Sequence, residues 1–353
     1  MIVKSIRKES LYFVLFVFLM MIASVTESLM FIALGILIAL FVYINLNKVK
    51  SNSIIIPKIV VSLLLFQNLS IGIGARLGNN FSDDLSWVTQ VPTIFIVVSY
   101  FIIIMNNKIR KREFLFFGYI ILNLMFFFIG SGTITARVVY LRNFLIFYMV
   151  FEIGRYYLNS GSKIKQFVDF FLKITVMAVI FGLIGFILGK TFYQLIGVLE
   201  VYKAKQYTAY RDGLPGNFMT LFGGVWVNRF VSLYYDPVNF SYFMSLACLI
   251  AYTSNKKFFF IIFLICEILT FGKGGLLVFG LAMMCMISQS LLNKYSIKIV
   301  RIFIISMAII SIVILVRVVL TYFSDDFGTY NHFYGIVTGI EAIKQNPLGH
   351  GFN

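Results

Sequence analysis

Apolar runs of about the length of a membrane-spanning helix follow one another along the whole chain. A helix that crosses a bilayer needs roughly 17 to 25 predominantly apolar residues, and eleven runs near this length occur in the sequence. They cover residues 11–26, 29–46, 54–75, 91–105, 114–130, 134–151, 167–188, 237–253, 258–271, 275–291 and 302–320. Because lipid offers no partner to backbone polar groups, each run is predicted to be a helix. We therefore expect an all-α polytopic membrane protein with about 11 transmembrane helices, forming a single integral membrane domain over residues 1–353.

The composition argues against a soluble protein. Of the 353 residues, 60% are hydrophobic and only 12% are charged, which is too few to coat a soluble globule of this size. The formal net charge of +16 would suggest a nucleic-acid partner in a soluble protein. In a membrane protein, the position of the basic residues relative to the apolar runs decides what the charge means.

The basic residues gather in alternate connecting segments. If the N-terminus is cytoplasmic, the cytoplasmic segments hold 17 of the 30 Lys and Arg residues. This asymmetry satisfies the positive-inside rule, so we predict a multi-pass protein with a cytoplasmic N-terminus. The charge then reports topology, and the expected partner is the lipid bilayer and not nucleic acid.

Two segments on the outer side are longer than a turn. Residues 189–236 form one long extracytoplasmic loop, and residues 321–353 form an extracytoplasmic C-terminal segment. No closing span follows the second segment, so we expect the natural chain to continue past Asn353.

A polar stretch joins the long outer loop to the span at 237–253. It contains Arg211, Arg229 and Asp236 among Gly and Pro residues that favour turns. A planar guanidinium at the edge of lipid suits phosphate recognition, because partial exclusion of water strengthens charge-assisted hydrogen bonds. Alternatively, Arg229 forms a structural ion pair with Asp236 or extends to lipid head groups. The spacing alone does not separate these hypotheses.

Lys273 lies in a glycine-rich turn between two spans, Leu269-Thr-Phe-Gly-Lys-Gly-Gly275. Free backbone N–H groups beside one ammonium would make a site for an anion. The spacing of a nucleotide-binding P-loop is absent. The alternative is a hairpin whose lysine contacts lipid phosphates.

Charged residues inside the apolar runs are costly. An arginine at mid-span costs about 2.5 to 3.5 kcal/mol on insertion scales, so Arg142 is expected to face an aqueous or amphiphilic cavity. Glu267 and Asp169 also lie within spans and are candidates for pairing with a cation.

The histidines and cysteines limit the chemistry further. His332 and His350 are the two histidines, and a histidine suits general base work near neutral pH, although a surface position is the simpler explanation. The three cysteines all lie in apolar runs and form no cluster with histidine. We therefore expect no disulfide framework, no metal site and no cofactor.

Outer cations near a membrane surface favour an anionic, lipid-linked substrate, since Arg and Lys can neutralise a pyrophosphate leaving group.

Three segments carry a resemblance to a known family. They are Arg229-Phe-Val-Ser232 with Asp236-Pro237, the turn at 269–275, and the run at 339–352 that ends in Pro347-Leu-Gly-His-Gly-Phe. In this order they resemble motifs of the O-antigen and capsular polysaccharide polymerases of Wzy type and of the related O-antigen ligases. Gly272 stands where the family usually has serine, and the similar portion covers roughly residues 211–353.

The resemblance implies a metal-independent, inverting glycosyltransferase of C-type (GT-C-like) architecture in the bacterial cytoplasmic (inner) membrane. It would join undecaprenyl-pyrophosphate-linked oligosaccharide repeat units on the outer leaflet, beside a flippase and a chain-length regulator. In that picture Arg229, Arg211 and Lys273 bind the pyrophosphate, and Arg142 lines the groove for the lipid tail. His332 or Asp236 activates the sugar hydroxyl.

Two other functions stay open. An O-antigen ligase would differ in its acceptor, a lipid A core in place of another repeat unit. A lipid-linked oligosaccharide flippase or other transporter would be expected to place its ionisable residues near mid-membrane. The basic residues that the topology does not explain gather toward the outer side of the membrane here, which favours a site at the membrane surface.

Overall fold

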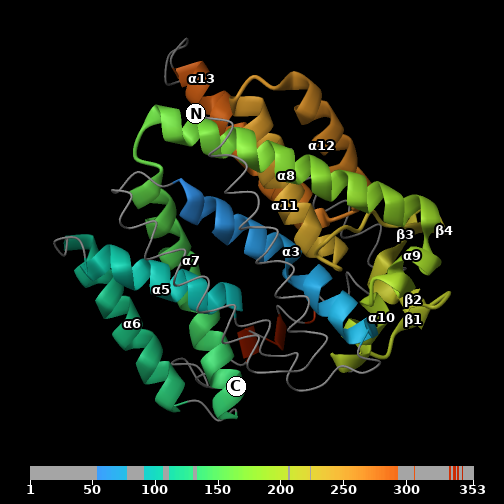
Figure 1. Ribbon diagram of the computed structural model, residues 1–353, viewed down its shortest axis with the longest axis horizontal. Helices are drawn as coiled ribbons and strands as arrows, with labels where there is room; N and C mark the ends of the chain where they lie inside the picture. The colour runs from blue at the N-terminus through green and yellow to red at the C-terminus, as the bar shows by residue number, and fades with distance from the viewer. Residues whose placement is uncertain are drawn as a thin grey trace. The chain divides into compact units, whose positions relative to one another are not determined.

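The computed structural model describes most of the central part of the chain. The described ranges are 54–77, 91–105, 111–129, 133–205, 207–222 and 224–292, with isolated positions between 306 and 344. They fall into two compact units, Met1–Lys111 with Arg142–Val278, and Arg112–Leu141 with Phe279–Asn353. Both units are mostly helical in their described parts (Figure 1).

Eight of the predicted spans lie in the described ranges, and each of them is a helix. These helices are α3 (Ile55–Leu77), α5 (Val91–Met105), α6 (Lys111–Ile129), α7 (Ile134–Tyr157), α8 (Gly161–Leu188), α11 (Pro237–Thr253), α12 (Lys257–Leu269) and α13 (Lys273–Leu292). The spans predicted at 11–26, 29–46 and 302–320 lie outside the described ranges.

Two helices of the described ranges, Ile55–Arg76 and Gly161–Leu188, are long and apolar enough to cross a membrane. On α8 the exposed face is apolar: Met177, Ile180, Ile184 and Ile187 recur at helical spacing and are all solvent-accessible. The opposite face packs inward through small residues such as Ala178. Such a helix needs an apolar surrounding on its outer face. The helical character is confirmed, while the membrane location, the eleven spans and the C-type architecture remain predictions.

The long loop predicted at 189–236 is a folded segment. It contains the short helices α9 (Lys190–Leu195) and α10 (Val198–Ala204), a 3-10 turn η1 (Gly216–Phe218) and two antiparallel hairpins. The hairpins pair β1 (Tyr210–Arg211) with β2 (Leu214–Pro215), and β3 (Met219–Phe222) with β4 (Val225–Asn228). Gly213 and Gly224 have positive φ, which tight hairpin turns require. These strands are an addition to the all-α expectation.

The folded segment 189–236 packs where several helices end. The ring of Phe230 lies 6.2 Å from that of Phe186 near the end of α8, and its N–H donates to Leu269 O at the end of α12 (2.8 Å). Arg76 at the end of α3 pairs with Glu200 of α10 (3.1 Å). Figure 1 shows the hairpins and α9 beside the C-terminal end of α8, and α10 beside the C-terminal end of α3. The helix ends that were predicted to be outer ends therefore lie together in this unit.

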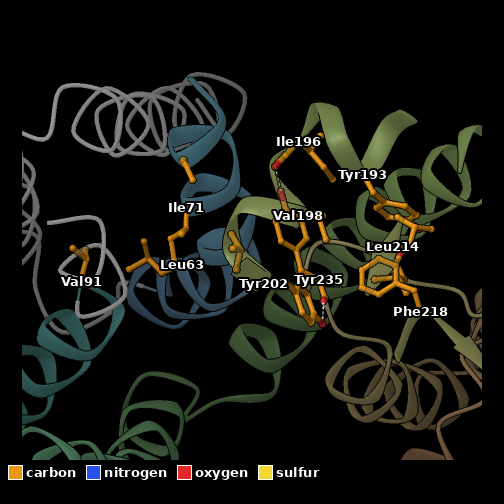
Figure 2. Packing of buried hydrophobic residues seen from close by; sticks show 13 residues of the cluster. Leu63, Ile71, Val91, Tyr193, Ile196, Val198, Tyr202, Leu214, Phe218 and Tyr235 are labelled. Carbon is orange, nitrogen blue, oxygen red and sulfur yellow. Dashed lines mark hydrogen bonds between the residues drawn. The ribbon is translucent and has the colours of Figure 1, made fainter. Parts of the chain in front are cut away.

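A buried cluster of aromatic and aliphatic residues fixes this segment to α3 (Figure 2). Tyr235 is 1% exposed and donates its hydroxyl proton to Ile196 O, while Tyr202 donates to Tyr235 O, both at 2.7 Å. Gly197 has φ +78°, and a Cβ there would collide with the carbonyl of Gly72 on α3. The two backbones meet so closely that only glycine fits at the contact.

Candidate functional site

The structure brings together two of the three segments that resemble the polymerases. Arg229 N donates to Phe218 O and Phe230 N donates to Leu269 O, each at 2.8 Å. The end of β4 is thus held between η1 on one side and the end of α12 on the other. The sequence separation between Phe230 and Leu269 makes this a tertiary contact, and it places Arg229 beside the glycine-rich turn. The third segment, 339–352, lies almost entirely outside the described residues.

The guanidinium of Arg229 is fixed by two backbone carbonyls. Nε donates to Thr270 O (2.7 Å), and Nη1 donates to Asn217 O (3.2 Å). Burial lowers the pKa of Arg229, and the negative charge of Asp236 opposes that shift. Within the described residues the hydrogen bonds of this guanidinium use Nε and Nη1.

Asp236 caps helix α11. One carboxylate oxygen accepts from Val238 N (2.9 Å), and the other accepts from the Asn239 side chain (2.8 Å). The following Pro237 occupies the first turn, where its missing N–H costs nothing. Among the described residues no ion pair within 4 Å joins Asp236 to Arg229, so their interaction is long-range. The role of Asp236 as a general base stays a prediction.

The glycines around Lys273 serve close packing of the first turn of α13 against α11. A Cβ on Gly272 or on Gly275 would collide with the Ser241 side chain. Phe271, just before this turn, has φ +50°. Lys273 begins α13 with an exposed side chain. The glycine pattern that suggested an anion nest therefore has a packing explanation, and Lys273 remains a candidate through its charge alone.

A cluster of buried polar side chains lies beside the glycine-rich turn at 269–275. Glu267 is fully buried, and its Oε1 accepts from Ser241 and Ser245 of α11, each at 3.0 Å. The same hydroxyls lie 3.1 Å from Gly272 O and 2.7 Å from Gly275 O. Within the described residues, Glu267 Oε2 has no hydrogen-bond partner. Among the described residues the partners of Glu267 are serine hydroxyls, and its pairing with a cation stays a prediction.

Substitutions of Glu267 are expected to separate its hydrogen bonds from its charge. Glu267→Gln keeps the shape and an amide oxygen that can accept from both serine hydroxyls, so we expect it to be accommodated. Glu267→Ala leaves both serine hydroxyls without this partner and opens a void, at a cost of about 1–3 kcal/mol. Melting temperatures of the purified proteins in detergent would test the order. Equal melting temperatures for the Gln and Ala variants would contradict a role for these hydrogen bonds.

Arg211 is exposed and stacks on an aromatic ring. Its Cζ lies 3.7 Å from the ring centroid of Trp226, which joins the two hairpins by a cation–π contact. The Lys190 side chain lies against the β1–β2 turn, since a Cβ on Gly213 would collide with it. Lys190 and Asn217 belong to no motif, so neither residue could be singled out from the sequence.

Two further candidates are Arg142 and His332. Arg142 lies on α7, where its Nε and Nη2 donate to Asn143 Oδ1 (3.2 and 3.0 Å). No described contact links Arg142 with Arg229. His332 lies outside the described residues.

Four cations lie on segments that contact one another. Arg229, Arg211, Lys190 and Lys273 belong to segments that the contacts above connect, whereas Asp236 is engaged as a cap. Among the described residues no group of three or more His, Cys, Asp or Glu side chains could hold a metal ion. The cluster is suited to binding phosphate through cations and backbone-fixed hydrogen-bond donors.

No related protein of known function helps to identify this site. Comparison with protein-family models, with curated proteins and with solved structures found no significant match to this chain.

Proposed function

We propose that this chain is a membrane glycosyltransferase that polymerises lipid-linked oligosaccharide repeat units on the outer leaflet of the bacterial cytoplasmic membrane. The observation that carries the proposal is the junction of segments 229–236 and 269–275, through the bonds from Arg229 and Phe230 to Thr270 and Leu269. These are two of the three segments that resemble the Wzy-type polymerases. Two helices that are long and apolar enough to cross a membrane support the location.

The donor is an oligosaccharide linked to undecaprenyl pyrophosphate. A hydroxyl oxygen of the acceptor sugar forms a bond to the anomeric carbon of the donor, while the bond from that carbon to the pyrophosphate oxygen breaks. Arg229 binds the developing pyrophosphate charge together with Arg211 and Lys273. The hydroxyl proton passes to His332 or Asp236, and Arg142 lines the path of the lipid tail. Attack from the opposite face inverts the anomeric centre.

The way Arg229 is held supports a reaction that relies on cations. A guanidinium held by two carbonyls needs no reorganisation when negative charge develops beside it, and partial burial strengthens the interaction. The residues that hold Arg229 come from η1 and from the end of α12, so the site is assembled by the folded outer segment together with a helix end.

Deletion of the gene in its host would test the function. We expect long polysaccharide chains to disappear while single repeat units persist on the surface lipid, and the full-length chain supplied on a plasmid to restore them. Loss of even the single unit would indicate a ligase. Accumulation of lipid-linked units on the inner leaflet would indicate a flippase and contradict the proposal.

A further inference from the structure

The tip of the β3–β4 hairpin is apolar on both of its faces. The strand register pairs Leu221 with Trp226 and Phe222 with Val225. All four side chains are exposed, with Phe222 at 62% and Val225 at 65%. Neighbouring residues of a strand point to opposite faces, so a hairpin with one packed face would expose only alternate ones. Four exposed apolar side chains at one tip indicate that something apolar covers it.

The hairpin lies at the level where the helices end. The ring of Phe222 is 5.7 Å from that of Phe271, just beyond the end of α12. At this same end of the unit, Ile187 of α8 is 78% exposed and Leu195 of α9 is 70% exposed. Figure 1 shows β3 and β4 beside the C-terminal end of α8, where these exposed apolar side chains lie.

Cations lie beside the apolar tip. Arg211 stacks on the Trp226 ring at 3.7 Å, and Lys190 lies against the adjoining β1–β2 turn. Trp side chains with neighbouring Arg and Lys are typical of the membrane–water interface, where the ring meets the acyl boundary and the cation meets phosphate. A soluble protein partner would be a poorer match, because the tip adjoins helix faces that are themselves apolar.

We propose that the β3–β4 hairpin is an interfacial anchor, which inserts Leu221, Phe222, Val225 and Trp226 into the phospholipid bilayer at the level of the head groups. β4 ends at Asn228, so the anchor holds the segment that carries Arg229 close to the membrane surface. The inference depends on the chain being embedded in a membrane and is independent of glycosyl transfer. Burial of the tip in lipid also explains why it needs no protein cover.

Tryptophan fluorescence can test the anchor directly, because Trp87 and Trp226 are the two tryptophans of the chain. In the full-length Trp87→Phe protein in phospholipid nanodiscs, all tryptophan emission comes from Trp226. We expect lipids brominated on their acyl chains to quench this emission at least twofold, and aqueous iodide to quench it weakly. Strong quenching by iodide with none by brominated lipid would overturn the proposal.

A second variant tests the tip itself. In the Trp87→Phe background, replacing Phe222 and Val225 by serine is expected to weaken quenching by brominated lipid and to raise quenching by iodide. Thr220→Ser, at the base of the same hairpin, serves as the matched control and should leave both unchanged. Equal quenching in the double variant and the control would overturn the role of the tip. Melting temperatures in nanodiscs would confirm that both proteins are folded.

Discussion

Arg229→Ala is expected to reduce polymerisation by about 10²-fold or more, the usual cost of removing a fixed donor that stabilises charge in a transition state. The variant loses the cation and also the bonds from the guanidinium to Thr270 O and Asn217 O. Arg229→Lys restores the positive charge but not the planar guanidinium with its several N–H donors. We therefore expect it to recover only part of the polymerisation activity. Chain length on gels, after incubation with purified lipid-linked repeat units, would measure the effect.

The matched control for this experiment is Lys165→Ala. Lys165 is an exposed cation near the start of α8, at the opposite end of that helix from the folded segment. Its removal changes the net charge by the same amount, and chain length should stay unchanged. Undiminished chain length in Arg229→Ala at an equal protein level would contradict the site. Full recovery by Arg229→Lys would show that charge alone matters there.

Gly275→Ala is expected to destabilise the protein by about 3 kcal/mol, at the upper end of ordinary overpacking. The new Cβ would collide with the Ser241 side chain, approach Glu267 Oε1 to 2.6 Å and lie 2.7 Å from the Ser241 backbone carbon. Relief would require α13 to move away from α11, which would strain the bond from Ser245 to Gly275 O. We expect the melting temperature in detergent to fall by roughly 5 °C or more.

Gly274→Ala is the control for this substitution, one residue away on the same turn. Its Cβ would meet the hydroxyl end of Tyr242, an exposed side chain that can rotate aside. Alanine favours a helix over glycine by about 1 kcal/mol, so this variant should be as stable as the natural protein or slightly more stable. A Gly274→Ala protein that melts as low as Gly275→Ala would refute the packing explanation of the glycines.

The positions of the helices follow closely from the sequence. The predicted runs at 91–105 and 237–253 coincide with α5 and α11. For α11 the reason is local, because Asp236 caps the first turn and Pro237 suits its start. For the other helices the apolar run itself is the signal, and the edges differ by a few residues where polar residues continue the helix, as at the start of α8.

The fold of residues 189–236 could not be derived in the same way. Its strands are two to four residues long, so no periodic pattern marks them. The hydrogen bonds from Arg229 to Thr270 O and Asn217 O use backbone carbonyls. Every residue has a backbone carbonyl, so these bonds could not be predicted from the residue types. The glycine-rich turn shows the same limit: its composition suited an anion site, and close packing on Ser241 explains it.

The sequence by itself therefore determined a mostly helical chain, the positions of the described helices and a set of candidate cations, because apolar length, caps and charge are local properties. Only the tertiary structure decided which candidates meet. It joined Arg229 to the turn before Lys273, gave Asp236 a capping role and placed the apolar hairpin tip at the helix ends. The physical reason is that these contacts connect segments that are distant in sequence. They depend on backbone groups and on shape, and neither of these can be predicted from the residue types along the chain.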